Sequence, residues 1–140
     1  MSTNQGGGCA CGAIRFTISA EPLFVGHCHC KDCQKMTGAH MATVAGIPAD
    51  AFMVNQGQAR VYDTIGDSGS KVHRHFCGEC GSTLYSTGDS MPGVVFVEAG
   101  ALDDASGWKP GMHIYTRSAQ PWANIPADMP AFPTMPPPEE

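Results

Sequence analysis

Alternating apolar and polar residues indicate several short strands along this chain. Ile14, Phe16 and Ile18 alternate with more polar neighbours, which is the period-two pattern of a half-buried strand. Further short strands are predicted at residues 23–25, 41–47, 60–62, 71–76, 83–85, 94–97 and 113–115. The chain contains 17 glycines and 11 prolines, so turns are expected between these runs.

Helical signals are weak by comparison. No segment shows the period of an amphipathic helix, and Pro48 to Phe52 is expected to form one helical turn that begins at the proline. The predicted fold class is therefore all-β, with mainly antiparallel short strands and one or two helical turns.

The length of 140 residues fits one domain. We expect a β domain over residues 1–125 and a proline-rich, extended tail over residues 126–140, with its last residues disordered. Proline has no N–H group to donate, so this tail is not expected to form strand ladders.

The balance of charge argues against some classes of partner. The formal net charge is −5 and no basic run exists, so binding to a nucleic-acid backbone is not expected. The N-terminal residues lack a charged start followed by an apolar stretch, and no apolar run approaches the roughly 20 residues of a membrane helix. The sequence predicts a cytoplasmic protein without a membrane partner, and its oligomeric state is left open.

Seven cysteines carry the clearest chemical signal, because thiols stay reduced in such a compartment and close spacings then indicate metal binding or catalysis. The C-x-x-C of Cys77 and Cys80 is flanked by glycines, as in a zinc knuckle, and supplies two ligands. Cys9 and Cys11 are the natural second pair. Together these four thiols predict a closed structural zinc site that stabilises the fold directly.

Cys28, Cys30 and Cys33 form a second group, with three thiols within six residues. Three protein ligands and an open position are typical of a catalytic zinc. Two alternatives remain open here: a redox cluster without metal, or a closed site with a histidine as the fourth ligand. The histidines considered for that position are His27, His29, His40, His73 and His75.

The motifs resemble those of the glutathione-dependent formaldehyde-activating enzyme family, which also includes centromere protein V. The resemblance rests on residues 7–16 (GGCACGAIRF), 27–35 (HCHCKDCQK), 74–81 (RHFCGECG), 113–115 (HIY) and 121–122 (PW). It extends from about Gly7 to Pro133. It implies a β-tent-like zinc fold with two zinc ions: a structural one on Cys9, Cys11, Cys77 and Cys80, and a second one with a vacant position on Cys28, Cys30 and Cys33. The second site can lose its ion during purification.

The same resemblance implies an activity, the condensation of formaldehyde with glutathione, which is a carbon–sulfur lyase reaction run in reverse. The thiol would occupy the open position as a thiolate, and a general acid would protonate the alkoxide. His29, between two ligands, is the expected but weak candidate for that acid. A non-catalytic zinc module that binds a protein or a small thiol is the competing hypothesis.

Several other residues are possible parts of a glutathione pocket or ordinary surface and core residues. The cations are Lys31, Lys35, Arg60, Arg74 and Arg117, and the indoles are Trp108 and Trp122. His73 and His75 share one face of a predicted strand, which could line the metal cleft or face solvent.

Overall fold

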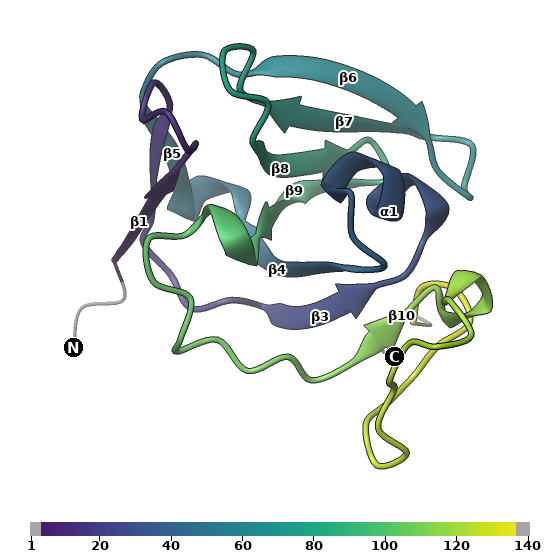
Figure 1. Ribbon diagram of the computed structural model, residues 1–140. Helices are drawn as coiled ribbons and strands as arrows, with labels where there is room; N and C mark the ends of the chain where they lie inside the picture. Colours follow the sequence, from purple (N-terminus) through teal and green to yellow (C-terminus); the bar gives the residue numbers. More distant parts are fainter. Residues whose placement is uncertain (1–3, 137–140) are drawn as a thin grey trace.

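The protein, described over residues 4–136 by a computed structural model, folds into a large and a small β-sheet with one short α-helix (Figure 1). The small sheet has the order β1-β2-β5 and comprises β1 (Gln5–Gly8), β2 (Arg15–Ile18) and β5 (Phe52–Gln56). The large sheet has the order β10-β3-β4-β9-β8-β7-β6. Its strands are β3 (Phe24–Cys28), β4 (Ala42–Pro48), β6 (Arg60–Ile65), β7 (Lys71–Phe76), β8 (Thr83–Gly88), β9 (Met91–Glu98) and β10 (His113–Ile114).

Nearly all strand pairs are antiparallel, and β10 with β3 is the parallel exception among the paired strands described. The prediction of a mainly antiparallel β protein is confirmed. The expected helical turn is also present, as the 3₁₀ turn Ala49–Ala51. Each strand predicted from hydrophobic patterning overlaps a strand of the structure.

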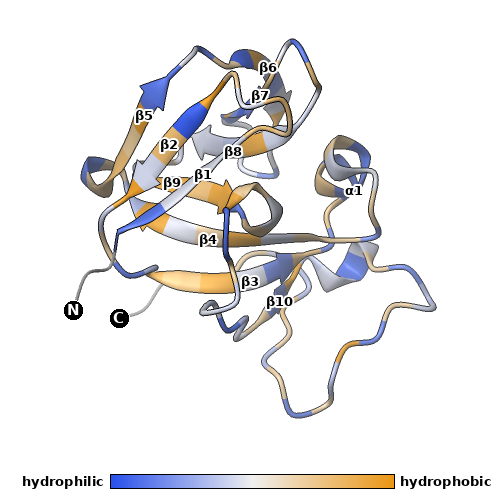
Figure 2. Cartoon of the chain, turned by 60° about the vertical axis from the view of Figure 1, so that its left-hand side comes forward, coloured by the Kyte–Doolittle hydropathy of each residue, from blue (hydrophilic) through white to orange (hydrophobic). Residues whose placement is uncertain are grey.

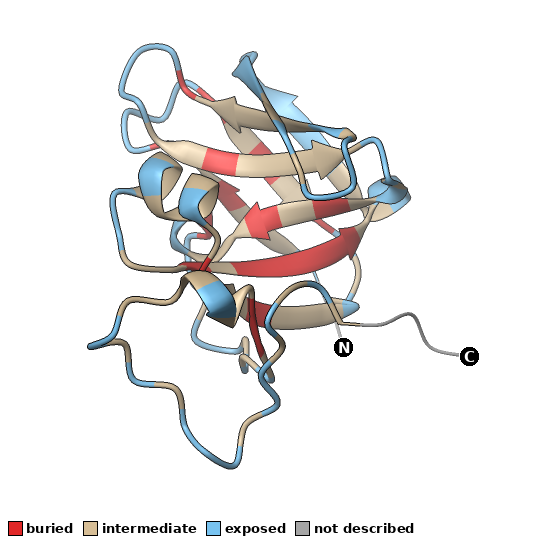
Figure 3. Cartoon of the chain, turned by 90° about the vertical axis from the view of Figure 1, so that its right-hand side faces the viewer, coloured by how far each residue is buried: buried red, intermediate tan, exposed pale blue. Residues whose placement is uncertain are grey.

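The core lies between the two sheets. On β9, Val95 and Val97 are buried and belong to the same cluster as Ile47 of β4 and Phe16 and Ile18 of β2. Figure 3 shows buried residues in the middle of the strands, whereas the connecting loops are mostly intermediate or exposed. Figure 2 shows apolar stretches on β3 and β4, which are paired neighbours in the large sheet.

The other face of the large sheet does not pack into this core. Since side chains alternate along a strand, Phe96 and Glu98 point away from Val95 and Val97. Glu98 lies directly opposite Val44 of β4 in the register. Burying one face of β9 in the core thus leaves its second face to line a cavity.

The helix α1 (Lys31–Thr37) follows β3 after a short connection, at a position that the sequence analysis did not predict. Cys30 is its N-cap: the Sγ of Cys30 accepts a hydrogen bond of 3.2 Å from the N–H of Cys33. Gly38 ends the helix with a φ of 70°, a conformation that glycine adopts without strain. The cap therefore places two cysteines side by side.

The C-terminal segment packs along β10. The N–H of His113 donates to the carbonyl of Pro130 at 2.9 Å, and the N–H of Phe132 donates to the carbonyl of His113 at 2.9 Å. Ala131 makes an isolated parallel bridge with His113. Local pairing is possible here, contrary to expectation, because a proline carbonyl still accepts and non-proline neighbours still donate.

The domain boundary at residue 125 stays a prediction, as does the end of the tail, since residues 137–140 lie outside the described part of the chain. Across residues 4–136, no helix has both the length and the apolar character needed to span a membrane.

Candidate metal centres

The first thiol group, the quartet, joins two distant turns. Cys9 and Cys11 lie between β1 and β2, and Cys77 and Cys80 lie between β7 and β8. The Sγ of Cys11 is 3.6 Å from that of Cys9 and 3.8 Å from that of Cys77. Sulfurs around a tetrahedral zinc, each bonded at about 2.3 Å, lie about 3.8 Å apart. The donor set and its spacing therefore fit a four-thiolate zinc site.

The backbone helps to form the quartet. Gly81 has a φ of 80°, and its N–H donates to the carbonyl of Cys77 at 2.8 Å, which closes the knuckle turn. The N–H of Ile14 donates to the Sγ of Cys9 at 3.2 Å. Cys9 and Cys77 are buried members of the core cluster, so this site ties the small sheet to the large one.

The second thiol group, the trio, consists of Cys28 at the end of β3 and Cys30 and Cys33 at the start of α1. The Sγ atoms of Cys33 and Cys28 are 3.4 Å apart. Hydrogen bonds from the Cys28 and Cys33 thiols lower the pKa of Cys30 well below its ordinary value. The trio thus combines a thiolate with two further sulfur donors, which suits a thiophilic cation.

No histidine nitrogen of residues 4–136 joins the trio as a fourth ligand. The closed-site alternative considered from the sequence therefore has no partner in this part of the chain. Both groups could hold metal ions, and their donor sets are compatible with zinc.

A cavity of about 550 Å³ opens beside the trio, on the face of the large sheet that points away from the core. Its walls come from β3, α1, β4, β6, the β6–β7 loop, β7, β8, β9, β10 and the C-terminal segment. All three trio cysteines line it. Its size lies within the range of roughly 300–1,000 Å³ that is typical of small-molecule sites.

Two ionisable residues stand out inside this cavity. The Nη1 of Arg74 on β7 lies 3.7 Å from the Sγ of Cys33, while its Nε donates to the Oγ1 of Thr64 at 3.1 Å. Burial raises the pKa of Glu98 to about 7, although the guanidinium of Arg74 opposes that shift. Within residues 4–136, no side chain makes a hydrogen bond or an ion pair with the Glu98 carboxyl.

His29, the acid expected from the sequence, does not line the cavity. Its side chain has no exposed surface, and its Nε2 is 2.8 Å from the Nδ1 of His113. The Nδ1 of His29 is buried without a hydrogen-bond partner. The structure thus places His29 within the protein, and a catalytic role for it stays a prediction.

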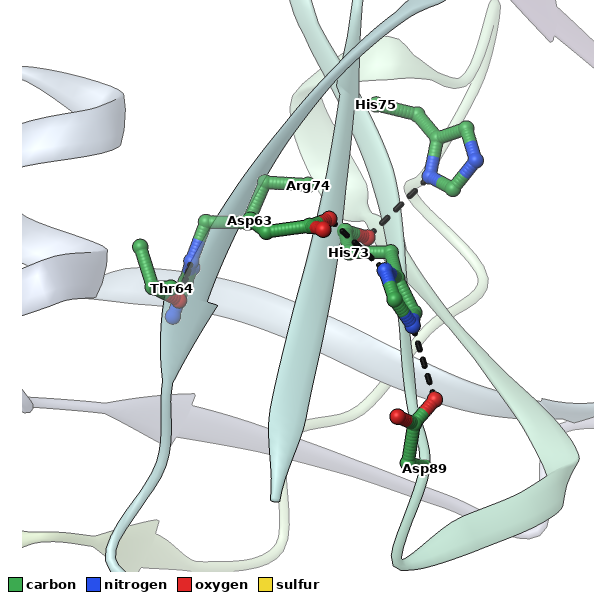
Figure 4. Close-up of polar contacts among 6 residues, drawn as sticks. All are labelled: Asp63, Thr64, His73, Arg74, His75 and Asp89. Atoms are coloured by element: carbon green, nitrogen blue, oxygen red, sulfur yellow. Dashed lines mark hydrogen bonds and ion pairs between the residues drawn. The ribbon is translucent and has the colours of Figure 1, made fainter. Parts of the chain in front are cut away.

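His73 and His75 do share a face, as expected, but neither lines the cavity. The Nδ1 of His73 is 2.7 Å from Asp63 and its Nε2 is 2.7 Å from Asp89, so its imidazole bridges two carboxylates (Figure 4). The ring of His75 stacks on Tyr85, with centroids 4.2 Å apart. Arg74, between the two histidines, is the residue of this strand that reaches the trio.

The other residues singled out in the sequence lie elsewhere: Lys31, Lys35, Arg60, Arg117, Trp108 and Trp122 are not among the cavity's lining residues. Arg117 pairs with Asp67 of the β6–β7 loop at 2.8 Å. Trp108 packs against the core, and Trp122 is exposed and lies against His40. Of the cations considered for a glutathione pocket, Arg74 is the one that lines the cavity.

Sequence reasoning missed Glu98 as a site residue. Alternation along residues 94–97 does place Phe96 and Glu98 on the face opposite Val95 and Val97. That this second face meets the trio depends on strand order and register, which the local sequence does not encode.

Comparisons with known proteins agree with these features. A family model described as glutathione-dependent formaldehyde-activating enzyme matches residues 4–118. A protein of Halomonas elongata, named as a candidate glutathione-dependent formaldehyde-activating enzyme, is 30% identical over 125 residues, which span 85% of this chain and 79% of the relative. A crystal structure of a Rhodobacter sphaeroides protein has a TM-score of 0.57 at 24% identity and covers 75% of this chain and 91% of that one, which shows a shared fold.

Proposed function

The chain belongs to the glutathione-dependent formaldehyde-activating enzyme family, and from that premise we propose that it is a zinc-dependent enzyme of the carbon–sulfur lyase type. It forms and cleaves the adduct of a thiol with a small aldehyde, such as S-hydroxymethylglutathione. Two zinc ions per chain are expected, one in the quartet and one at the trio. The place of action is the cytoplasm, where the seven thiols stay reduced.

One observation carries this proposal: three cysteines face a ligand-sized cavity, and no fourth protein ligand from residues 4–136 completes their group. When bound there, zinc would supply a coordination position that holds an incoming thiol as a thiolate near neutral pH. The quartet has four protein ligands and two buried cysteines, so it serves the fold. The chemistry therefore belongs to the trio and its cavity.

Glu98 is the general acid–base of this mechanism. As a carboxylate, it accepts the proton that the substrate thiol loses. The sulfur then attacks the carbonyl carbon, a C–S bond forms, and the electron pair of the C=O π bond moves to oxygen. Glu98 returns its proton to that oxygen, which leaves a hydroxyl group on the product. A pKa of about 7 suits both halves of this exchange.

Arg74 and the cavity walls position the reactants. The guanidinium of Arg74 lies beside Cys33 and stabilises negative charge on the cluster. Apolar side chains such as Val72 and Phe96 surround the reacting groups and reduce contact with water. Thiol and aldehyde held together in this cavity lose much of the entropic barrier to reaction.

The test compares the zinc-loaded protein with Cys30→Ser. Exchange between free thiol and S-hydroxymethyl adduct is followed by NMR in a mixture of formaldehyde and thiol, with glutathione and uncharged thiols each tried. The proposal predicts exchange well above the spontaneous rate for at least one thiol, and loss of that acceleration in Cys30→Ser.

If the wild type never exceeds the spontaneous rate with any thiol, the lyase proposal is wrong. A thiol that binds at the trio without turnover would instead favour the non-catalytic zinc module.

A further inference from the structure

We propose that the cavity selects a thiol without net negative charge and with an apolar body, in preference to glutathione itself. This inference rests on the proposed function, because it concerns the thiol that enters beside the trio. The evidence is the distribution of charge around the cavity. Among residues 4–136, its lining includes the acidic residues Asp32, Asp67 and Glu98 and one basic residue, Arg74.

Glutathione carries two carboxylates and one ammonium group, so it is anionic at neutral pH even before its thiol ionises. Binding it requires cationic partners for its carboxylates, as arginine forks provide in many sites. The lining provides the opposite: Asp67 is already paired with Arg117, and Arg74 is the one basic residue beside Asp32 and Glu98 among the described residues. Like charges in a partly enclosed site repel more strongly than in bulk water.

Arg74 already contacts other groups of the protein. Its Nη1 lies 3.7 Å from the Sγ of Cys33 and its Nε donates to Thr64. Three thiolates around a zinc dication would leave one net negative charge on the cluster, and Arg74 would balance that charge. Little of its positive potential remains for a substrate carboxylate.

Arg117 is a second candidate, because it contacts a lining residue, but its charge is already paired. Its Nη2 pairs at 2.8 Å with Asp67, which lines the cavity from the β6–β7 loop. The hydroxyl groups of Ser68, Ser86 and Ser90 complete the polar part of the wall. Hydroxyls can hydrogen-bond a neutral amide or alcohol, but they do not offset the charge of a carboxylate.

The rest of the wall is apolar and suits an uncharged body. It includes Val44, Val72, Met91, Phe96, Ile114 and Met135. These side chains come from strands on both sides of the trio and from the C-terminal segment. A thiol whose remaining atoms are apolar or neutral would bury surface here without leaving a charge unpaired.

The test uses the cobalt-loaded full-length protein and two thiols that differ in one group, N-acetylcysteine and N-acetylcysteine amide, with glutathione as a third probe. Thiol entry at the trio changes the cobalt absorption bands, and dissociation constants are compared per thiolate to remove differences in thiol pKa. We expect the amide to bind at least about tenfold more tightly than either anionic thiol.

The charge mechanism is tested by Asp67→Asn, which removes a carboxylate and frees Arg117. Affinity for glutathione should rise severalfold, whereas affinity for the amide stays unchanged. The matched control is Asp50→Asn, which changes the net charge equally at an exposed residue outside the cavity lining.

If N-acetylcysteine or glutathione binds as tightly as the amide, the inference is wrong while the proposed function stands. If no thiol changes the cobalt bands, the proposed function itself is wrong, and the inference falls with it.

Discussion

The Nη1 of Arg74 lies 3.7 Å from the Sγ of Cys33, a contact between residues 41 positions apart in the chain. This contact joins β7 to the start of α1, and both residues line the cavity beside the trio. A fixed positive charge next to three thiols favours their ionised forms, which are the forms that bind zinc. The strand that carries His73 and His75 thus reaches the metal centre through the residue between them.

Replacing Arg74 by methionine should weaken zinc binding at the trio by about 10- to 150-fold, because a charge-assisted contact of this kind contributes about 1.5–3 kcal/mol. Competition with a chromophoric chelator measures the affinity of the more weakly bound of the two zinc ions. Lys71→Met, an exposed change on the same strand, should leave both affinities unaltered. Equal weakening in both variants would show that net charge matters, and not this contact.

The two thiol groups should differ in their effect on stability. Cys77 is buried in the core, so Cys77→Ser should abolish the structural site and lower the unfolding midpoint by at least about 15 °C, or prevent folding. Cys30→Ser should retain about one zinc per chain, with a midpoint within about 5 °C of the wild type. Elemental analysis and thermal unfolding measure both quantities, and similar stability losses in the two variants would contradict the assignment.

Glu98→Gln should slow exchange between thiol and adduct by about 10²- to 10⁴-fold, the usual effect of a general acid–base. In the direction of addition, the wild-type rate should rise as pH rises through about 7, because the Glu98 carboxylate accepts the proton of the thiol. In the direction of cleavage, the rate should rise through the same range, because the same carboxylate accepts the hydroxyl proton.

Loss of this dependence of the rate on pH, in both directions of the reaction, is the expected signature in Glu98→Gln. Glu21→Gln, a change outside the cavity lining, serves as the control and should keep the pH dependence of the rate. If the Glu98 variant kept that pH dependence, another group would be the general acid–base.

His73 should make the stability of the fold depend on pH. Hydrogen bonds with Asp89 and Asp63 raise the pKa of His73 above its ordinary value near 6.5. Its contribution is therefore fully present below that ordinary value and disappears as pH rises through the higher folded value. The difference in unfolding midpoint between wild type and His73→Gln should be larger at about pH 5.5 than at about pH 8.5.

His40→Gln is the comparison for that experiment, since His40 lies against the exposed Trp122 and not between carboxylates. A midpoint difference for His73→Gln that is the same at both pH values would show that the bridge contributes no charge-dependent stability.

Hydrophobic patterning predicts much of this fold, and particular residues show why some elements are not predicted. Alternation identifies β2 through Phe16 and Ile18, and an apolar run identifies β9, whose Val95 and Val97 lie in the core. β1 carries no such signal, since its residues are Gln-Gly-Gly-Gly. A Cβ on Gly7 would lie 2.5 Å from the carbonyl oxygen of Ala101, so close packing explains the glycine there.

The helix α1 escapes sequence analysis for a related reason. It has seven residues, none of them buried, so no apolar period exists to detect. Its start is fixed by the Cys30 cap, whose side chain also belongs to the trio. Cysteine spacing therefore indicated a metal group without revealing the helix that holds it.

The sequence likewise predicts one part of the candidate site and misses another. The grouping of the seven cysteines follows from their spacing and agrees with the two groups of the structure. The cavity, Arg74 and Glu98 depend on the register of β4, β9, β8 and β7, in which Glu98 lies opposite Val44 and Arg74 opposite Ser86. Long-range pairing of this kind has no local signature, which is why His29 was considered and Glu98 was not.

The central claim is that the trio holds a metal ion with one position open to the cavity. Anomalous diffraction at the zinc edge, from crystals of the zinc-loaded protein soaked with N-acetylcysteine amide, tests it most directly. The account predicts one ion within Cys9, Cys11, Cys77 and Cys80, and a second on Cys28, Cys30 and Cys33 whose fourth ligand is the sulfur of the added thiol. A side chain of the protein in that fourth position would contradict it.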